Sequence, residues 1–338
     1  MPKGTFHLGA GVVLQNTAKT FAIGKVTGSG SLGGNCTLGG SVSGNNVWQV
    51  GNDEDYTLSA LVIDNAAFTK IGSGKITVNQ AWTTTGAIRI NAGTLLLKSG
   101  ASLGTGTLVV STNSKLVGTT KSTVPLSNTT VTISGTLQPG LSETSASGMI
   151  YFGGKNVTFS RTGTLVCGLR KCLTVSASTG KATMGNAYLS QIGTLRFYEG
   201  ATIAPFLDSS YQPTTDEAVA DSFLLWTDVN KITMPDVSTL QFRLPELPLG
   251  NYWDTSRITE GLLFVRYDSG LANGITPVPH HEKVSVRMYA TDGKFVAAWK
   301  GLYGNLSTDC KQHGEPDKVY LLKIIIGNGE TRTMKMKN

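Results

Sequence analysis

Apolar residues along this chain fall in short groups of three to five, separated by Gly, Asn, Ser and Thr. Amphipathic helical patterns of ten or more residues are nearly absent. Short apolar groups bounded by turn-forming residues are typical of β-strands joined by tight turns. The pattern therefore predicts an all-β protein built from many short strands.

One phrase, a Gly-Thr-Leu or a close variant followed by apolar residues, recurs before Glu199. It begins at Gly74, Gly93, Gly106, Gly135, Gly163 and Gly193. Recurrence at roughly 20 to 30 residues is typical of solenoids, in which each coil covers the next. We therefore expect a parallel β-helix with glycines at its corners. The expected core residues of its repeats are Leu95, Leu97, Leu103, Leu108, Val110 and Leu116. An ordinary β-sandwich remains the alternative, because the spacing of the phrase is irregular.

The residue composition changes at three points along the chain, so we expect four regions. Residues 1–198 form the repeat stalk, and residues 199–267, which hold most bulky aromatics and prolines, form a cap that ends the solenoid. Residues 268–282 contain Gly, Pro and a His pair and form a linker. Residues 283–338 alternate apolar and polar positions around an Asp-Gly turn, which predicts a small Ig-like β-sandwich.

Composition and charge exclude several classes of protein. Charged residues make up 15% of the chain, and the net charge is +7. No basic run or basic helix concentrates that charge, so we expect no nucleic-acid partner. No apolar stretch is long enough for a transmembrane helix. The N-terminus lacks the pattern of a signal peptide, so the chain is expected to be cytosolic or a fragment of a longer protein, and the rest of the sequence favours the fragment.

Residues that could carry chemistry are sparse, and we predict neither catalytic residues, nor a metal, nor a cofactor. The single acidic cluster, Asp53-Glu54-Asp55, is interpreted as a solvated loop, with a weak cation site as the alternative. His280 and His281 are interpreted as solvated linker residues rather than metal ligands. Cys167 and Cys172 flank a short corner and are a candidate disulfide in an oxidising compartment.

Three tryptophans raise the question of sugar binding. Trp48, Trp82 and Trp299 lie in polar or Gly-rich surroundings, and sugar faces stack on indole rings. We expect each of them to be a partly buried packing residue. Surface glycans remain the alternative partner.

Residues 68–118 resemble the autotransporter-associated β-strand repeat. The shared pattern is Lys-x-Gly-x-Gly, then Ala-Gly-Thr-Leu, then a small residue before x-Leu-Gly. It falls on Lys70, Gly72, Gly74, Ala92, Gly93, Thr94, Leu95, Leu103, Gly104 and Leu116. Residues 221–265 are similar to the end of such passengers. The resemblance implies a structural β-helical stalk in a secreted or surface-exposed bacterial protein.

Residues 283–338 resemble the C-terminal type IX secretion (Por) sorting domain of Gram-negative bacteria. The positions that carry the resemblance are Val284, Val286, Tyr289, Gly293, Lys294, Val296, Val319, Tyr320 and Lys323, together with the closing Lys-rich strand. The link before Val319 is longer than the family pattern, and Lys318 occupies a position where Gly is usual. The resemblance implies export across the outer membrane by the secretion machinery found there.

Taken together, these observations predict a noncatalytic secreted or cell-surface protein, a stalk or adhesin-like passenger, in a Gram-negative bacterium. Parallel β-helices also carry polysaccharide lyases and hydrolases, whose sites need clustered acids. The alternative is therefore the C-terminal accessory part of a carbohydrate-active enzyme whose catalytic part lies upstream.

Overall fold

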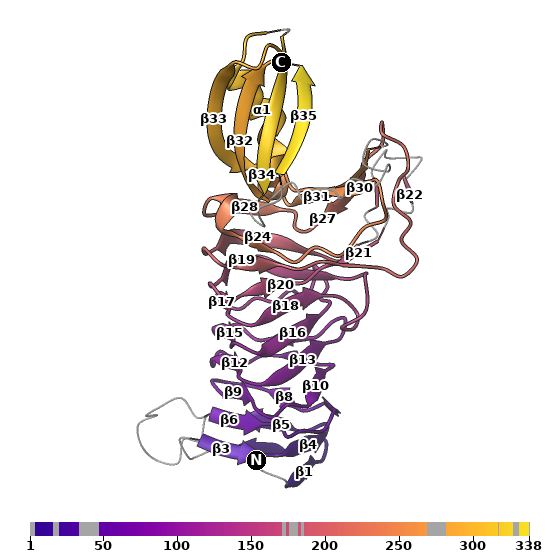
Figure 1. Ribbon diagram of the computed structural model, residues 1–338. Coiled ribbons are helices and arrows are strands. Elements are labelled where there is room, and N and C mark those ends of the chain that lie inside the picture. Colours follow the sequence, from indigo (N-terminus) through magenta and orange to yellow (C-terminus); the bar gives the residue numbers. More distant parts are fainter. Residues whose placement is uncertain are drawn as a thin grey trace. The chain divides into compact units, whose positions relative to one another are not determined.

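The computed structural model describes residues 4–15, 20–33, 47–170, 174–175, 182–183, 186–268, 282–316, 318–326 and 331–337. Nearly all of the described elements are β-strands (Figure 1). Long parallel sheets form the N-terminal part, and the C-terminal sheets are antiparallel and fit an Ig-like domain. The predicted fold class, a parallel β-helix followed by a small antiparallel domain, is confirmed.

The chain divides into two compact units. The first contains Met1–Tyr211 and Leu224–Pro245, and the second contains Gln212–Phe223 and Glu246–Asn338. The first unit therefore takes up strands from the segment predicted as the cap, because those strands extend its parallel sheets. The predicted linker, 268–282, lies outside the described residues except at its two ends, and so do His280 and His281.

One parallel sheet of the first unit has eight described strands. In spatial order they are β7 (Tyr56–Leu58), β10 (Lys75–Val78), β13 (Gly93–Leu97), β16 (Ser114–Gly118), β18 (Thr136–Pro139), β20 (Thr164–Leu165), β25 (Thr202–Ile203) and β29 (Gln241–Phe242).

A second parallel sheet has nine described strands. In spatial order they are β3 (Thr20–Ile23), β6 (Val47–Val50), β9 (Ala67–Lys70), β12 (Ile88–Ile90), β15 (Leu108–Val110), β17 (Thr130–Ile133), β19 (Met149–Phe159), β24 (Tyr188–Phe197) and β28 (Val229–Thr233). Figure 1 shows these strands stacked one above another from β3 to β28.

Shorter sheets complete the first unit. The parallel ones are β1 (Thr5–Leu8) with β4 (Lys25–Gly28), β2 (Val13–Gln15) with β5 (Ser31–Gly33) and β8 (Leu61–Val62), β11 (Ala81–Trp82) with β14 (Ser102–Leu103), and β21 (Gly168–Leu169) with β26 (Phe206–Leu207). The strands β22 (Thr174–Val175) and β23 (Ala182–Thr183) pair antiparallel, and a 3₁₀ turn, η1, spans Val237–Thr239.

Apolar side chains of like kind lie in rows along the inside of this unit. The strand register places Leu95 opposite Leu116, and Leu108 opposite Ile88 and Val131. All six expected repeat-core residues are fully buried: Leu95, Leu97, Leu103, Leu108, Val110 and Leu116. Each such burial stabilises the fold by about 1.5 to 3 kcal/mol. No coil could bury these faces alone, so the rows make each coil depend on its neighbours.

The parallel register decides between the two architectures that the sequence left open. Sequential strands pair in parallel, as Ile76 with Leu95 and Leu116 with Leu137. A β-sandwich is built from antiparallel strands, so the sandwich alternative is wrong for this region.

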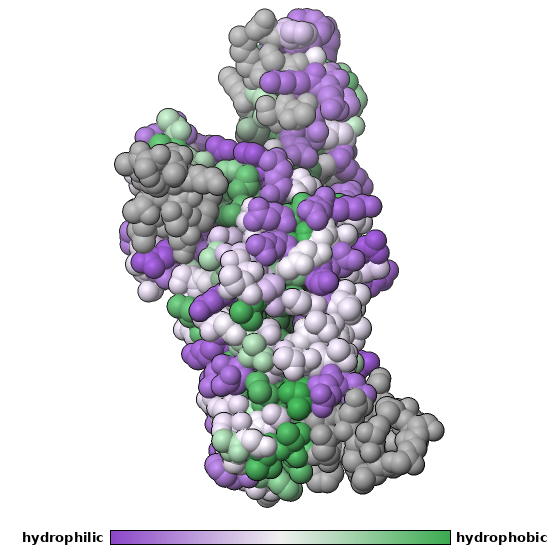
Figure 2. Space-filling view, turned by 180° about the vertical axis from the view of Figure 1, so that it is seen from behind, coloured by the Kyte–Doolittle hydropathy of each residue, from purple (hydrophilic) through white to green (hydrophobic). Residues whose placement is uncertain are grey.

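Figure 2 shows hydrophobic colour gathering at the end of the stack that holds the N-terminal strands, where Phe6, Val12 and Val13 are exposed.

The second unit contains two sheets. The first is a three-stranded sheet of β27 (Asp221–Leu224), β31 (Leu262–Tyr267) and β30 (Asn251–Asp254), with the 3₁₀ turn η2 (Ile258–Glu260). In this sheet β30 pairs antiparallel with β31. Asn251 donates a hydrogen bond to the carbonyl oxygen of Thr214, and Arg266 pairs with Asp254 at 2.6 Å.

The second sheet has its strands in the order β33 (Phe295–Leu302), β32 (Lys283–Ala290), β34 (Val319–Ile326) and β35 (Thr331–Lys337). A 3₁₀ turn, η4 (Tyr303–Asn305), leads into the helix α1 (Leu306–His313). Helix α1 brings Leu306 and Cys310 into a core with Val286, Leu322 and Ile324. This part of the chain thus has a hydrophobic core of its own.

Candidate functional site

Lys70 occupies an interior position that aliphatic residues fill in the neighbouring coils. The register pairs it with Val50 on one side and Ile90 on the other, and both are fully buried. Lys70 itself has no exposed surface. A charged side chain in such a row is expensive unless its hydrogen-bonding groups are satisfied.

The ammonium group of Lys70 is satisfied by three backbone carbonyls at a corner of the coil. Its Nζ donates to the carbonyl oxygens of Ile71 at 3.0 Å, Gly72 at 2.7 Å and Ala92 at 3.0 Å. An ammonium group has three protons, so each finds an acceptor. Burial lowers the pKa of Lys70 to about 8, and the nearby carboxylates of Asp55 and Asp53 oppose that shift. We call this arrangement the lysine corner. It joins two successive coils, because Ala92 belongs to the coil after Lys70.

The glycines of the Lys-x-Gly-x-Gly phrase allow the coils to approach at this corner. Gly72 has a φ of +74°, and a side chain there would lie 2.1 Å from the carbonyl oxygen of Asn52. A side chain at Gly74 would lie 2.3 Å from the carbonyl oxygen of Glu54. Backbone contacts this close leave no room for a Cβ atom. The phrase that carries the repeat resemblance thus has a local physical explanation.

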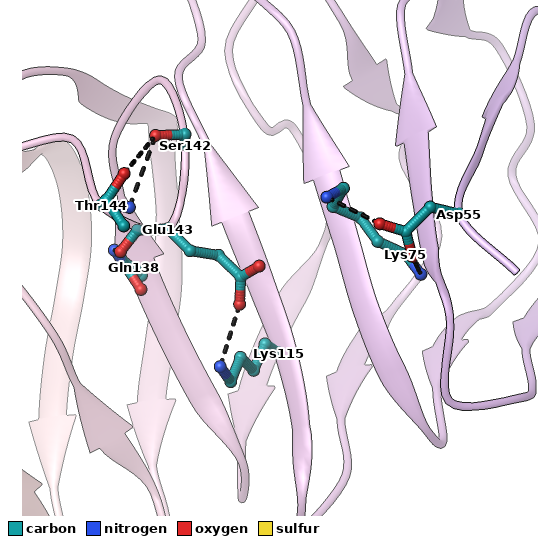
Figure 3. A network of polar contacts seen from close by, with 7 residues as sticks. All are labelled: Asp55, Lys75, Lys115, Gln138, Ser142, Glu143 and Thr144. Atoms are coloured by element: carbon teal, nitrogen blue, oxygen red, sulfur yellow. Dashed lines mark hydrogen bonds and ion pairs between the residues drawn. The ribbon is translucent and has the colours of Figure 1, made fainter. Parts of the chain in front are cut away.

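The acidic cluster Asp53-Glu54-Asp55 joins three coils. Asp53 Oδ1 accepts hydrogen bonds from the backbone N–H and the hydroxyl of Ser73, at 3.1 and 2.7 Å. Asp55 accepts from the backbone of Lys75 and pairs with its ammonium at 2.9 Å (Figure 3). Glu54 reaches the preceding coil, 3.6 Å from Lys25. These contacts lower the pKa of the Asp53 and Asp55 carboxyls, chiefly through their hydrogen bonds.

This geometry refines the interpretation of the cluster. Its carboxylates are solvent-exposed, as a solvated loop requires. Each of them, however, engages a residue of an adjacent coil. Within the described ranges, no three His, Cys, Asp or Glu side chains lie together in a way that could hold a metal ion.

A similar contact lies on the outer surface of the eight-stranded sheet. Lys115 of β16 pairs with Glu143 at 2.9 Å, and Gln138 of β18 donates to the backbone carbonyl of Glu143 at 2.7 Å (Figure 3). Glu143 belongs to the loop between β18 and β19, so these contacts hold that loop against the sheet. Figure 3 shows Lys75 of β10 beside Asp55, the residue just before β7.

A shallow, uncharged groove of about 390 Å³ lies on the surface of the stack. It crosses successive coils and is lined by Asn65, Thr85, Gly86, Ala87, Thr105, Gly106, Thr107 and Thr129. None of these residues is charged, and the four threonines are exposed. Within the described chain the buried amide oxygen of Asn65 has no hydrogen-bond partner. The groove therefore offers hydroxyl and amide groups to a neutral, hydrogen-bonding ligand.

The residues expected to form the sorting domain separate into core and surface. Val284, Val286 and Tyr320 are buried in the core of the C-terminal sheet. Tyr289 is half-buried and packs its ring against Phe295 at 5.9 Å. Gly293, with a φ of +85°, and Lys294 form the turn between β32 and β33. Lys323 is exposed on β34.

The candidate tryptophans and cysteines are placed as follows. Trp48 and Trp82 are 1% and 2% exposed, so their faces are closed to a sugar. Trp299 is half-buried and stacks on the ring of His313 at 4.8 Å. Cys167 is buried, and desolvation raises the pKa of its thiol. Cys172 lies outside the described residues, so the Cys167–Cys172 disulfide stays a prediction.

Two features escaped the sequence analysis. The sequence motif includes Lys70 but does not reveal that its ammonium group is buried. The signal that could have indicated this is the alternation of the strand, which places Lys70 on the same inward face as Phe68. The groove was missed because its residues come from four coils and carry no charge.

No protein-family model matches the chain, and no curated protein matches it. Across the described ranges, no helix is both long and apolar enough to cross a bilayer.

Proposed function

We propose that this protein is a noncatalytic β-helical stalk of a secreted or cell-surface protein from a Gram-negative bacterium. The observation that carries the proposal is that four charged side chains of the stack contact residues of adjacent coils. Lys70 bonds to the carbonyl of the following coil, and Asp53, Asp55 and Glu54 bind residues of adjacent coils. Side chains committed in this way hold coils together and leave the stack to act as a support.

Export is proposed to depend on residues 283–338, acting as a type IX sorting domain that engages the outer-membrane secretion machinery. The support is the resemblance at Val284, Val286, Gly293 and Lys323, together with the separate core of this region. A region with a hydrophobic core of its own can fold separately from the rest of the chain. The secretion machinery could then recognise it whatever cargo it is attached to.

The test is an export assay with the whole chain. The chain, given a cleavable signal peptide, is expressed in a bacterium that has type IX machinery, beside a variant ending at residue 282. We expect the whole chain on the cell surface or in the medium and the shortened variant in the periplasm. Equal distribution of the two variants would exclude the sorting role, and retention of both inside the cell would exclude export.

A second candidate function is favoured by the threonine-lined groove: an accessory, glycan-binding part of a carbohydrate-active enzyme. An uncharged groove with hydroxyl groups at successive coils suits a neutral polysaccharide segment. Titration calorimetry with neutral oligosaccharides would test it. Binding that is lost in Thr105→Val with Thr107→Val, and kept in Thr57→Val on the opposite sheet, would support this function. Absence of binding at millimolar ligand would exclude it.

A further inference from the structure

The C-terminal sheet has a face opposite to helix α1, which we call the open face. Helix α1 contributes Leu306 and Cys310 to the core, together with alternate residues of the strands such as Val286 and Ile324. Because successive side chains of a strand point to opposite faces, the intervening residues belong to the open face. Among them, Lys283, Arg287, Lys300 and Lys323 are exposed.

Two like charges lie directly opposite each other on the open face. Arg287 of β32 pairs in the register with Lys323 of β34. On their other sides the register places Ala298 next to Arg287 and Thr333 next to Lys323. Like charges at directly opposite positions destabilise a sheet. The four strands contain seven Lys or Arg residues and no Asp or Glu, so the sheet supplies no carboxylate that would offset this repulsion.

An apolar row lies beside this cationic row. Tyr289 pairs in the register with Phe295 on one side and with Leu321 on the other. Phe295 is 60% exposed, and Val319, two residues from Leu321, is 41% exposed. Two residues along a strand span about 7 Å, so the apolar and cationic rows are adjacent.

We propose that the open face binds the surface of an anionic phospholipid bilayer. Phosphate groups would offset the repulsion between Arg287 and Lys323, and Phe295 and Val319 would enter the headgroup region. Cations beside exposed apolar side chains are the arrangement by which proteins lie on an anionic membrane. The apolar row favours a bilayer over an acidic polymer in water, because such a polymer leaves Phe295 exposed.

The test is flotation of the whole chain with vesicles. We compare phosphatidylcholine vesicles with vesicles that also contain about a third phosphatidylglycerol, at low salt and at high salt, where surface charges are screened. We expect binding to the anionic vesicles alone, weakened at high salt. Arg287→Glu removes one positive charge from this surface and adds a negative one, so it should weaken binding roughly tenfold or more.

The Arg287→Glu variant also separates binding from folding. It places an opposite charge beside Lys323, so its thermal midpoint should equal or exceed that of the wild type while its vesicle binding falls. The matched control is Lys311→Glu on helix α1, which makes the same change in net charge away from the open face and should bind as the wild type. Phe295→Ser should reduce the binding that persists at high salt.

Four results would overturn the proposal. The first is no flotation with anionic vesicles at low salt. The second is an equal loss of binding in Arg287→Glu and Lys311→Glu, which would make net charge alone responsible. The third is unchanged binding in Phe295→Ser. The fourth is binding to polyglutamate as tight as binding to vesicles, which would identify an acidic polymer or protein as the partner.

Discussion

The ammonium nitrogen of Lys70 lies 2.7 Å from the carbonyl oxygen of Gly72, between the aliphatic side chains of Val50 and Ile90 in the neighbouring coils. The same nitrogen donates to Ala92 in the following coil. The buried ammonium group therefore links two successive coils at the position where β9 ends and the chain turns.

The first prediction concerns the titration of Lys70. Its side chain should titrate near pH 8, because burial lowers its pKa to about that value, while exposed lysines should titrate near about 10.4. NMR of protein labelled at lysine side chains measures both, and Lys70→Gln identifies the signal by its loss. A midpoint above pH 10 for Lys70 would show that the group is solvated.

A second prediction gives the sign of the pH dependence of stability. Between about pH 8 and pH 10.5 the unfolded chain keeps the Lys70 proton that the folded chain has lost, so raising the pH favours the folded state. The unfolding free energy of the wild type, relative to Lys70→Met, should therefore rise over this range by up to about 1.4 kcal/mol per pH unit. Urea unfolding of both proteins at several pH values measures it. Parallel curves for the two proteins would contradict the lysine corner.

A third prediction concerns close approach at a coil corner. A Cβ atom at Gly106 would lie 1.8 Å from the carbonyl oxygen of Gly86, so Gly106→Ala must push two coils apart. We expect a loss of about 3 kcal/mol or more in unfolding free energy. Gly4→Ala is the matched control, since nothing lies within 4 Å of its Cβ position, and it should change stability by less than about 0.5 kcal/mol. Similar effects of the two substitutions would mean that the coils are not in this contact.

A fourth prediction tests the stacked core. Leu108→Ala should destabilise the protein by about 2 to 5 kcal/mol, because Leu108 is fully buried between Ile88 and Val131. Leu141 is 54% exposed in the same unit, and Leu141→Ala should have little effect. Urea unfolding of the two variants measures the difference. A small loss for Leu108→Ala would place that residue outside the core.

A fifth prediction addresses the acidic cluster. The pKa values of the Asp53 and Asp55 carboxyls are lowered in the folded chain, so their contribution to stability is present above about pH 4 and is lost as the pH falls through the folded pKa. Asp53→Asn with Asp55→Asn should therefore make stability less sensitive to pH below about 4. Acid unfolding followed by circular dichroism measures this, with Glu199→Gln, at an exposed position of the same unit, as control. Identical acid transitions in all three proteins would show that the cluster does not join coils.

The sequence predicted the architecture well, because hydrophobic alternation and corner glycines are local signals. The five core leucines and Val110 could be named from the recurring phrase in which they stand, and the structure buries each of them. The contacts of Asp53 with Ser73 and of Asp55 with Lys75 could not be named, because they depend on which coil lies against which. For the same reason the groove at Thr85, Thr105 and Thr129 was beyond prediction. The like-charge pair Arg287–Lys323 required the strand register, which turn signals alone do not fix.

The measurement that tests the central claim most directly is the location of the native chain in its own bacterium. Intact cells are treated with a protease that cannot enter them, then fractionated, and the chain is detected with an antibody. A cell-surface stalk should be found in the outer-membrane or medium fraction, and its cell-associated signal should disappear on protease treatment. A chain found in the soluble cytoplasmic fraction and protected from the protease would contradict the account.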